Sequence, residues 1–367
     1  MHAVVVFGLF ALTQSAAGQM LPTASAELGP PPQFSAGVQP QVPPASVPQA
    51  ASVIAVDPTN RYRVSLLYRN VYAAEDTVVS GWNGSVSPCN AGTTTQAFQD
   101  ATIERVNVLR ALAGLSGDVA GFGLGSTQKT DDQAAALMMV ANQSLNHTPP
   151  PAWKCYTAAG STGAGSSNLT LGQNFNYNGP TAIEGYMDDE GSNNTYVGHR
   201  RWILYPPQMQ MASGDVDAVT ASVNFSVNAL WVFGFSNAHA SIPNGTPWPS
   251  RGYVPWQLLP ENSNRWSLSI QNANFSGASV TMTRNGAALA APSIDPPEFN
   301  GQPNGTFIGD NTLVWEPTGV TYTQPAQDVV YHVSVTGITG AGATTSVSYT
   351  VTVINPYDAI FANGFEG

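Results

Sequence analysis

The chain has 367 residues, of which 43% are hydrophobic and 10% are charged, and its formal net charge is −11. This length exceeds that of one ordinary domain and predicts two domains with flanking tails. The acidic balance argues against nucleic acid and anionic lipid headgroups as partners. Abundant glycine and proline beside few charged residues are typical of a loop-rich, β-rich extracellular protein.

The N-terminal segment indicates export. Residues 3–12 are apolar and are followed by small residues at 15–18, so residues 1–18 are predicted to be a signal peptide. Residues 19–54 are rich in proline and alanine and are predicted to be a linker. The expected location is therefore secreted, at the cell surface or outside the cell, with the periplasm as an alternative. No later segment is long and apolar enough to predict a membrane span.

The chain contains two cysteines, Cys89 and Cys155. In an oxidising compartment an isolated pair predicts one disulfide, here closing a loop of about 66 residues. The alternative is a pair of buried free thiols.

Apolar spacing predicts four helices in the first half of the chain. The first begins near Thr59, and the second covers residues 95–113. The third begins near Thr130, where Thr130 and Gln133 fit a capping box, and it must end before the prolines at 149–151.

The fourth helix is predicted to begin at Pro180, and Thr181 with Glu184 fits a second capping box. On this pattern Glu184 is predicted to be a cap rather than a catalytic acid. Ser126 and Lys129 also fit an SxxK pattern, but no KTG partner follows in the sequence. Such a pattern is frequent by chance, so no catalytic role is assigned to it.

The segment 186–204 holds the densest group of functional side chains. Three carboxylates, including Asp189, end the fourth helix, and His199 follows a polar loop. Carboxylate and imidazole close together can bind a metal, transfer protons or orient a ligand. The alternative is that His199 only packs at a loop-to-strand junction. A second histidine, His147, is expected at the end of the third helix, where it could point into a cleft.

These landmarks occur in the order found in one family. The sequence Asn146-His147-Thr148 precedes Asn168-Leu169, an aromatic-Met helix and then Gly198-His199-Arg200, while residues 105–115 look like a first family helix. Over residues 56–259 the chain resembles the CAP superfamily, the secreted SCP/Tpx-1/Ag5/PR-1-like domains, in its bacterial form. The predicted CAP-like domain covers residues 55–259.

The resemblance implies an α-β-α sandwich with a cleft lined by two histidines and, in many members, two acids. The histidines correspond to His147 and His199, and the second acid corresponds to Asp189. Ser167, followed by Asn168, stands where the family has its first glutamate. The loss of one acid weakens a proton-transfer role but leaves a site of two histidines and one carboxylate.

The second half of the chain is predicted to be β-rich. Residues 219–225 and 229–233 are expected to be strands of the CAP-like sheet. Later strands are expected at 266–270, 279–284, 329–335 and 346–353, with a type I′ hairpin at Asn285-Gly286. Residues 260–355 are therefore predicted to be an immunoglobulin-like β-sandwich. Residues 356–367 form a tail, either a sorting signal or a frayed end.

The predicted fold class is thus α+β, a CAP-like sandwich followed by an all-β sandwich. The expected function is a non-enzymatic binding module for a small apolar molecule, a cell-envelope component or a protein partner. A metal-assisted secreted hydrolase using the same cleft is the alternative, and a surface scaffold is a third. Zn²⁺ or another divalent ion is the expected cofactor, bound by His147 and His199.

Overall fold

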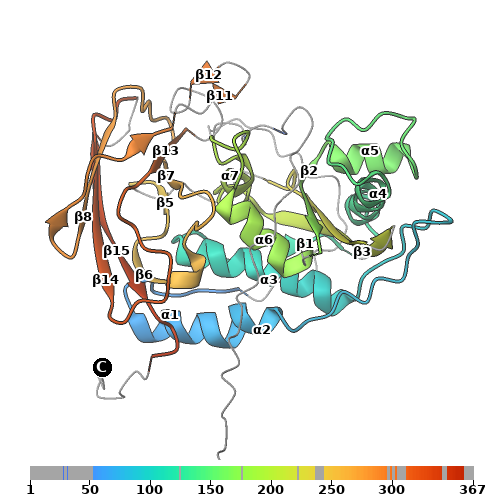
Figure 1. Cartoon of the computed structure of the whole chain (residues 1–367), viewed down its shortest axis with the longest axis horizontal. Helices are drawn as coiled ribbons and strands as arrows, with labels where there is room; N and C mark the ends of the chain where they lie inside the picture. Colours follow the sequence, from blue (N-terminus) through green and yellow to red (C-terminus); the bar gives the residue numbers. More distant parts are fainter. Residues whose placement is uncertain are drawn as a thin grey trace, which may run out of the picture.

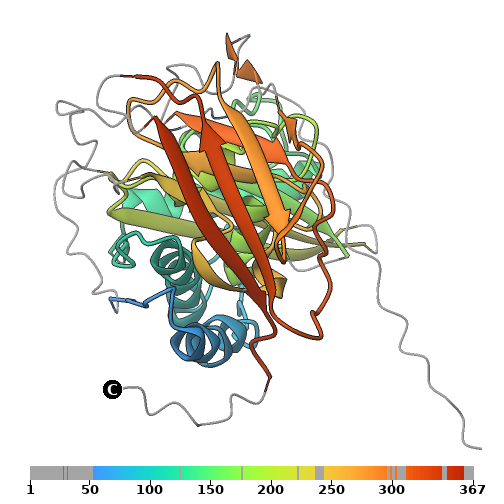
Figure 2. The same ribbon diagram turned by 90° about the vertical axis from the view of Figure 1, so that its left-hand side faces the viewer.

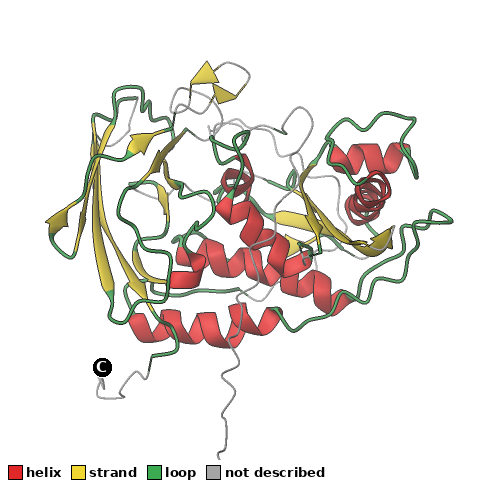
Figure 3. Ribbon diagram, viewed as in Figure 1, coloured by secondary structure: helices red, strands yellow, loops and turns green. Residues whose placement is uncertain are grey.

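Helices and β-sheets both build this protein, which confirms the predicted α+β class (Figures 1 and 3). The predicted signal peptide, most of the linker and the tail from residue 359 lie outside the residues that the structure describes. None of the described helices is long and apolar enough to cross a membrane. The computed structural model describes residues 28, 31, 53–123, 125–174, 177–220, 223–235, 244–295, 298–299, 302–303, 311–340 and 345–358.

The first helical segment consists of α1 (Arg61–Leu67), a π-helical turn η1 (Tyr68–Tyr72) and α2 (Ala73–Glu75). The next helix, α3 (Gln96–Leu112), begins after Thr95, whose side chain accepts a hydrogen bond from the Phe98 N–H. This confirms the helix predicted for residues 95–113.

The helix α4 (Thr127–Asn142) begins before the predicted capping box. Its N-cap is Ser126, whose hydroxyl accepts a hydrogen bond from the Lys129 N–H. The Ser126-x-x-Lys129 pattern is therefore the N-terminal cap of this helix. The side-chain amide of Gln133 donates instead to the carbonyl of Asp215, so the predicted capping box at Thr130 is wrong.

A four-stranded sheet lies at the centre of the helical part. Its order is β1 (Ala120–Gly121), β3 (Gln210–Thr220), β4 (Val223–Trp231), β2 (Ser167–Gln173), and only β1 and β3 are parallel. The predicted strand 219–225 is wrong, because these residues contain the end of β3 and the beginning of β4.

Helices cover both faces of this sheet (Figure 1). On one face α4 packs against β3 and β4, with α5 (Ala158–Ala164) beside it, and Val227 and Ala229 belong to that core. On the other face α3, α6 (Gly179–Asp188) and α7 (Gly198–Ile203) share a second core with Leu230. The architecture here is a helix–sheet–helix arrangement of three layers.

The C-terminal part consists of two mainly antiparallel β-sheets that pack face to face (Figure 2). Side chains of β7 and β13 meet those of β14, and the rings of Trp266 and Tyr331 lie 5.6 Å apart. The larger sheet has the order β6-β15-β14-β8-β9 and the smaller β10-β13-β7-β5. Their strands are β5 (Thr246–Trp248), β6 (Gly252–Pro255), β7 (Trp266–Ser269), β8 (Ser279–Arg284), β9 (Ala287–Ala288), β10 (Ser293–Ile294), β13 (Thr312–Glu316), β14 (Val329–Thr336) and β15 (Ser346–Ile354).

The strands predicted for the second half are confirmed by β7, β8, β14 and β15. The predicted hairpin turn is also confirmed, because Asn285 and Gly286 both have positive φ. A short separate pair, β11 (Glu298–Phe299) and β12 (Gln302–Pro303), lies between β10 and β13 in the chain.

The two sheets include strands that precede residue 260, the boundary predicted from composition. β5 pairs with β7, and β6 pairs in parallel with β15. A single apolar core extends from α3 and α6 into these sheets, and Trp248 at the end of β5 is 1% exposed within it. Residues 244–259 thus link the two parts of the fold.

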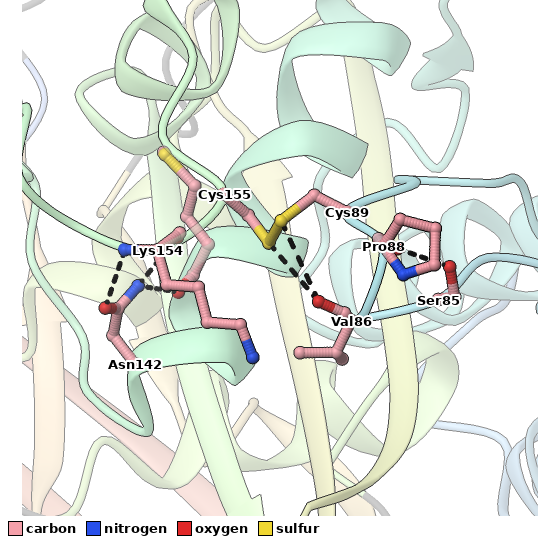
Figure 4. The surroundings of a disulfide bond; sticks show 8 residues. Ser85, Val86, Pro88, Cys89, Asn142, Lys154 and Cys155 are labelled. Carbon is pink, nitrogen blue, oxygen red and sulfur yellow. Dashed lines mark hydrogen bonds between the residues drawn. A yellow bond between two sulfur atoms is a disulfide. The ribbon is translucent and has the colours of Figure 1, made fainter.

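The predicted disulfide between Cys89 and Cys155 is present (Figure 4). It joins the turn before α3 to the segment that follows α4. Nearby, the side-chain amide of Asn142 donates to the carbonyl of Lys154 and accepts from its N–H, so the last turn of α4 holds this segment in place.

Candidate functional site

The central pair of the site is Asp189 and His199. Asp189 follows the last residue of α6 and has a left-handed backbone, which turns the chain away from the helix axis. Its Oδ1 lies 2.8 Å from His199 Nδ1, and its Oδ2 accepts from the Arg200 N–H at 3.1 Å. Both side chains are almost fully buried. When neutral, His199 therefore carries its proton on Nδ1 and its lone pair on Nε2.

Two buried arginines hold the loop between α6 and α7 in place. The Arg200 guanidinium donates to the carbonyls of Met187 and Asp188, and Arg265 donates to those of Asp189 and Gly191. Burial lowers the pKa of Arg200 to about 10, which leaves it charged at neutral pH. No role was predicted for either arginine from the sequence.

His147 lies beyond the end of α4, which stops at Asn142, so the prediction that it ends this helix is wrong. Its Nδ1 is 2.7 Å from the carbonyl oxygen of Ala164, the last residue of α5. Only a protonated Nδ1 can donate to this carbonyl, so the lone pair again lies on Nε2. Burial, with a smaller contribution from nearby His199, lowers the pKa of His147 to about 4.

Ser167 and Asn168 begin β2, the strand at the edge of the central sheet. The Asn168 side chain donates to the carbonyl of His199 at 3.2 Å, and its Oδ1 is buried without a partner among the described residues. The Ser167 hydroxyl donates to Asp132 Oδ1 at 2.7 Å rather than to either histidine. Asn168 thus contacts the backbone of His199, whereas Ser167 belongs to a separate buried hydrogen bond.

Two further residues, to which the sequence had assigned no role in the site, complete its surroundings. Tyr186 on α6 stacks on the His199 ring with centroids 5.3 Å apart, and its hydroxyl donates to the carbonyl of Asn168. Asp132 on α4 is fully buried and also accepts from the Trp231 N–H. Burial raises the pKa of Asp132 well above its ordinary value.

His147 and His199 are the predicted metal ligands. Within the described residues, no three His, Cys, Asp or Glu side chains are grouped as ligands of one ion. The Asp189 carboxylate uses one oxygen for His199 and the other for the Arg200 N–H, so its role in this structure is to orient the histidine. The two Nε2 atoms are the donors that a metal would use.

Comparisons with known proteins add no relative. No protein-family model, no curated protein and no solved structure matches this chain. Any inference of function therefore rests on the chemistry of these side chains. They combine two imidazoles of fixed tautomer with one buried carboxylate that holds one of the rings.

Proposed function

We propose that this chain is an exported binding protein, with a CAP-type domain followed by an immunoglobulin-like sandwich. The helix–sheet–helix layering and the order of His147, Asn168 and His199 support the first part. The face-to-face sheets support the second. The disulfide is compatible with an oxidising, extracellular environment.

The observation that carries this proposal is the way both histidines are fixed. Each Nδ1 donates to a stationary oxygen, from Asp189 in one case and from the Ala164 backbone in the other. In each neutral ring the lone pair is therefore on Nε2, and His147 stays neutral at physiological pH. Two such acceptors suit a hydrogen-bond donor on a ligand, or one divalent ion such as Zn²⁺.

The proposed ligand is a small apolar molecule, a cell-envelope component or a protein partner. Zinc would be held by His147 and His199, with water or ligand atoms in the remaining places. Asp189 would act on the metal through His199, as carboxylates beside metal-bound histidines do. Bound zinc would supply a polarising positive charge next to the ligand.

Calorimetric zinc titration tests this site. The wild type is expected to bind zinc, and His147→Ala/His199→Ala is expected to lose that binding. His332→Ala is the matched control, because His332 is exposed on β14. Equal zinc binding by the wild type and the double variant, or no binding by either, would remove the metal from the proposal. Organic extraction of the purified protein then identifies any bound apolar molecule.

A second candidate function is a metal-assisted hydrolase. The specific observation in its favour is the pair of Asp189 and His199, since a carboxylate that orients an imidazole is a common arrangement for a general base. Metal-dependent cleavage of an ester or peptide that is lost in His147→Ala and reduced in Asp189→Asn would establish the enzyme. No turnover with zinc present would leave the binding module.

A further inference from the structure

The loop that joins α6 to α7 has an unusual backbone at both of its ends. Asp189 has a φ of 58° at the first end, and Val197 has a φ of 48° two residues before His199. A β-branched residue adopts the left-handed region only at an energetic cost, and Val197 is fully buried. Such a conformation persists only where the surrounding structure holds it. The contacts that hold this loop therefore influence where the His199 ring lies.

Contacts from the C-terminal part hold the chain on both sides of this loop. They come from residues 262–267, which lead into β7. The Asp188 carboxylate, directly before the loop, accepts from the backbone N–H groups of Asn262 and Ser263 at 3.0 and 2.8 Å. After the loop, Arg200 Nη1 donates to two oxygens of the same segment, at 2.9 and 3.1 Å. One short segment thus contacts both neighbours of the Asp189–His199 pair.

Arg265, in the middle of this segment, contacts the loop itself. Its side chain is buried, and its Nη1 donates to the carbonyl oxygens of Asp189 and Gly191, each at 2.9 Å. The first of these carbonyls belongs to the residue whose side chain accepts from His199 Nδ1. The planar guanidinium has donors in fixed directions, so it restricts the orientation of the peptide groups that it contacts.

Two acids of the smaller sheet set the direction of the Arg265 side chain. Its Nε lies 3.2 Å from Asp295 Oδ2 and 3.7 Å from Glu316 Oε1. Asp295 follows β10, Glu316 ends β13 and Arg265 precedes β7, and these three strands are neighbours in this sheet. One end of the smaller sheet therefore directs a guanidinium at the loop beside His199.

His147 is held in a different way. Its Nδ1 donates to the carbonyl of Ala164 at the end of α5, which belongs to the helix–sheet–helix part. This hydrogen bond involves neither Arg265 nor the smaller sheet. A change in the contacts of Arg265 is therefore expected to act on one histidine of the pair and to leave the other in place.

We propose that Arg265 is a positioning residue of the two-histidine site, so that the C-terminal part sets the orientation of the His199 ring. The influence passes from the guanidinium to the Asp189 backbone, then to the Asp189 carboxylate and to His199 Nδ1. The C-terminal part is on this basis a component of the site and not a separate module. The inference rests on the proposed function, because it concerns how one proposed zinc ligand is held.

The first test is nitrogen NMR of the metal-free full chain containing isotopically labelled histidine, which reports the tautomer of each ring. In the wild type, both His147 and His199 are expected to carry the proton on Nδ1. In Arg265→Met, His199 is expected to lose this preference and His147 to keep it. The matched control is Arg251→Met, which removes a guanidinium that also donates to two loop carbonyls, those directly before β5. It is expected to change neither ring.

Calorimetric zinc titration gives the second readout. Arg265→Met is expected to weaken zinc binding by about tenfold or more, as the loss of groups that orient a metal-bound histidine does. Asp295→Asn keeps the guanidinium and removes the charge that directs it, so a smaller weakening is expected. Arg251→Met is expected to bind zinc as the wild type does.

Two results would overturn the proposal. The first is an unchanged His199 tautomer in Arg265→Met, or in Asp295→Asn if the methionine variant does not fold. The second is an equal change at His147 and His199, which would show a general loss of structure. Absence of zinc binding by the wild type would remove the zinc site of the proposed function, and the ring spectra of the metal-free protein would still decide the role of Arg265.

Discussion

Asp189 accepts a hydrogen bond from Nδ1 of His199 over 2.8 Å, with both side chains withdrawn from solvent. The same carboxylate accepts the backbone N–H of Arg200. One acid at the end of α6 thus fixes both the ring and the backbone at the start of α7. The orientation of the His199 ring depends on this contact.

Replacing Asp189 by Asn removes the charge and leaves a near-isosteric amide. Because hydrogen bonds to a buried charged group are lost, the free energy of unfolding is expected to fall by about 1–3 kcal/mol. Urea denaturation measures this change. The control Asp328→Asn removes a partly exposed ion pair with Arg61 and is expected to cost less than about 1 kcal/mol. Equal stability of wild type and Asp189→Asn would contradict the orienting role.

Arg105 is the second residue whose loss is expected to be severe. Its guanidinium is fully buried and donates to Glu75, to Asp76 at 2.6 Å and to Glu184 at 2.5 Å. Arg105→Met leaves these acids without their cation, so unfolding free energy is expected to fall by about 3–5 kcal/mol.

Guanidinium denaturation of Arg105→Met beside Arg63→Met provides the comparison, since Arg63 is exposed on α1. A similar small effect in both variants would indicate that Glu75 and Glu184 find other partners or become protonated without loss of stability. Protonation of Glu75 is relevant because burial raises the pKa of this side chain to about 8.

Asp215 makes the free energy of unfolding depend on pH, and the direction of this dependence follows from its raised pKa. Burial raises its pKa from 3.8 to about 6 in the folded chain. The folded state then binds more protons than the unfolded state between these values. The contribution of Asp215 to stability is therefore present below about pH 4, declines as pH rises through about 6, and is constant above.

The decline attributable to this one carboxyl is about 3 kcal/mol. His147 acts in the opposite direction, because its pKa is lowered to about 4 and the unfolded state binds the extra proton. Urea denaturation is expected to show that, from pH 4 to 7, the change in unfolding free energy is about 3 kcal/mol more favourable in Asp215→Asn than in the wild type. An identical pH profile in the two proteins would contradict the assignment.

The sequence indicated an acid near His199 but not the residues that surround this pair. Both residues lie in the segment 186–204, where carboxylates precede a histidine, and the resemblance to the CAP superfamily implied Asp189 as the acid. The burial of Asp132 could not be predicted, because an acid within a helix is usually exposed. Its contact with Ser167 arises only in the folded chain. Arg265 was missed because its partners lie more than 70 residues earlier in the chain.

Some short sequence patterns fit more than one local structure and led to wrong predictions. Thr181 and Glu184 fit a capping box, yet α6 begins at Gly179 and the Glu184 side chain reaches Tyr72 and Arg105 instead. The prediction that Glu184 is a cap is therefore wrong. The strands β5 and β6 were not predicted, because each is only 3–4 residues long and contains proline.

These two short strands change what is expected from proteolysis. Composition alone predicts that a cut near residue 260 releases two separate fragments. The pairing of β5 with β7 and of β6 with β15 crosses that point, and Trp248 is buried in the shared core. After cleavage between residues 256 and 264, the two pieces are expected to elute together at the intact mass in size-exclusion chromatography. They are expected to separate only when denaturant breaks these contacts. Separation in native buffer would show that the contacts across residue 260 are too weak to hold the two parts together.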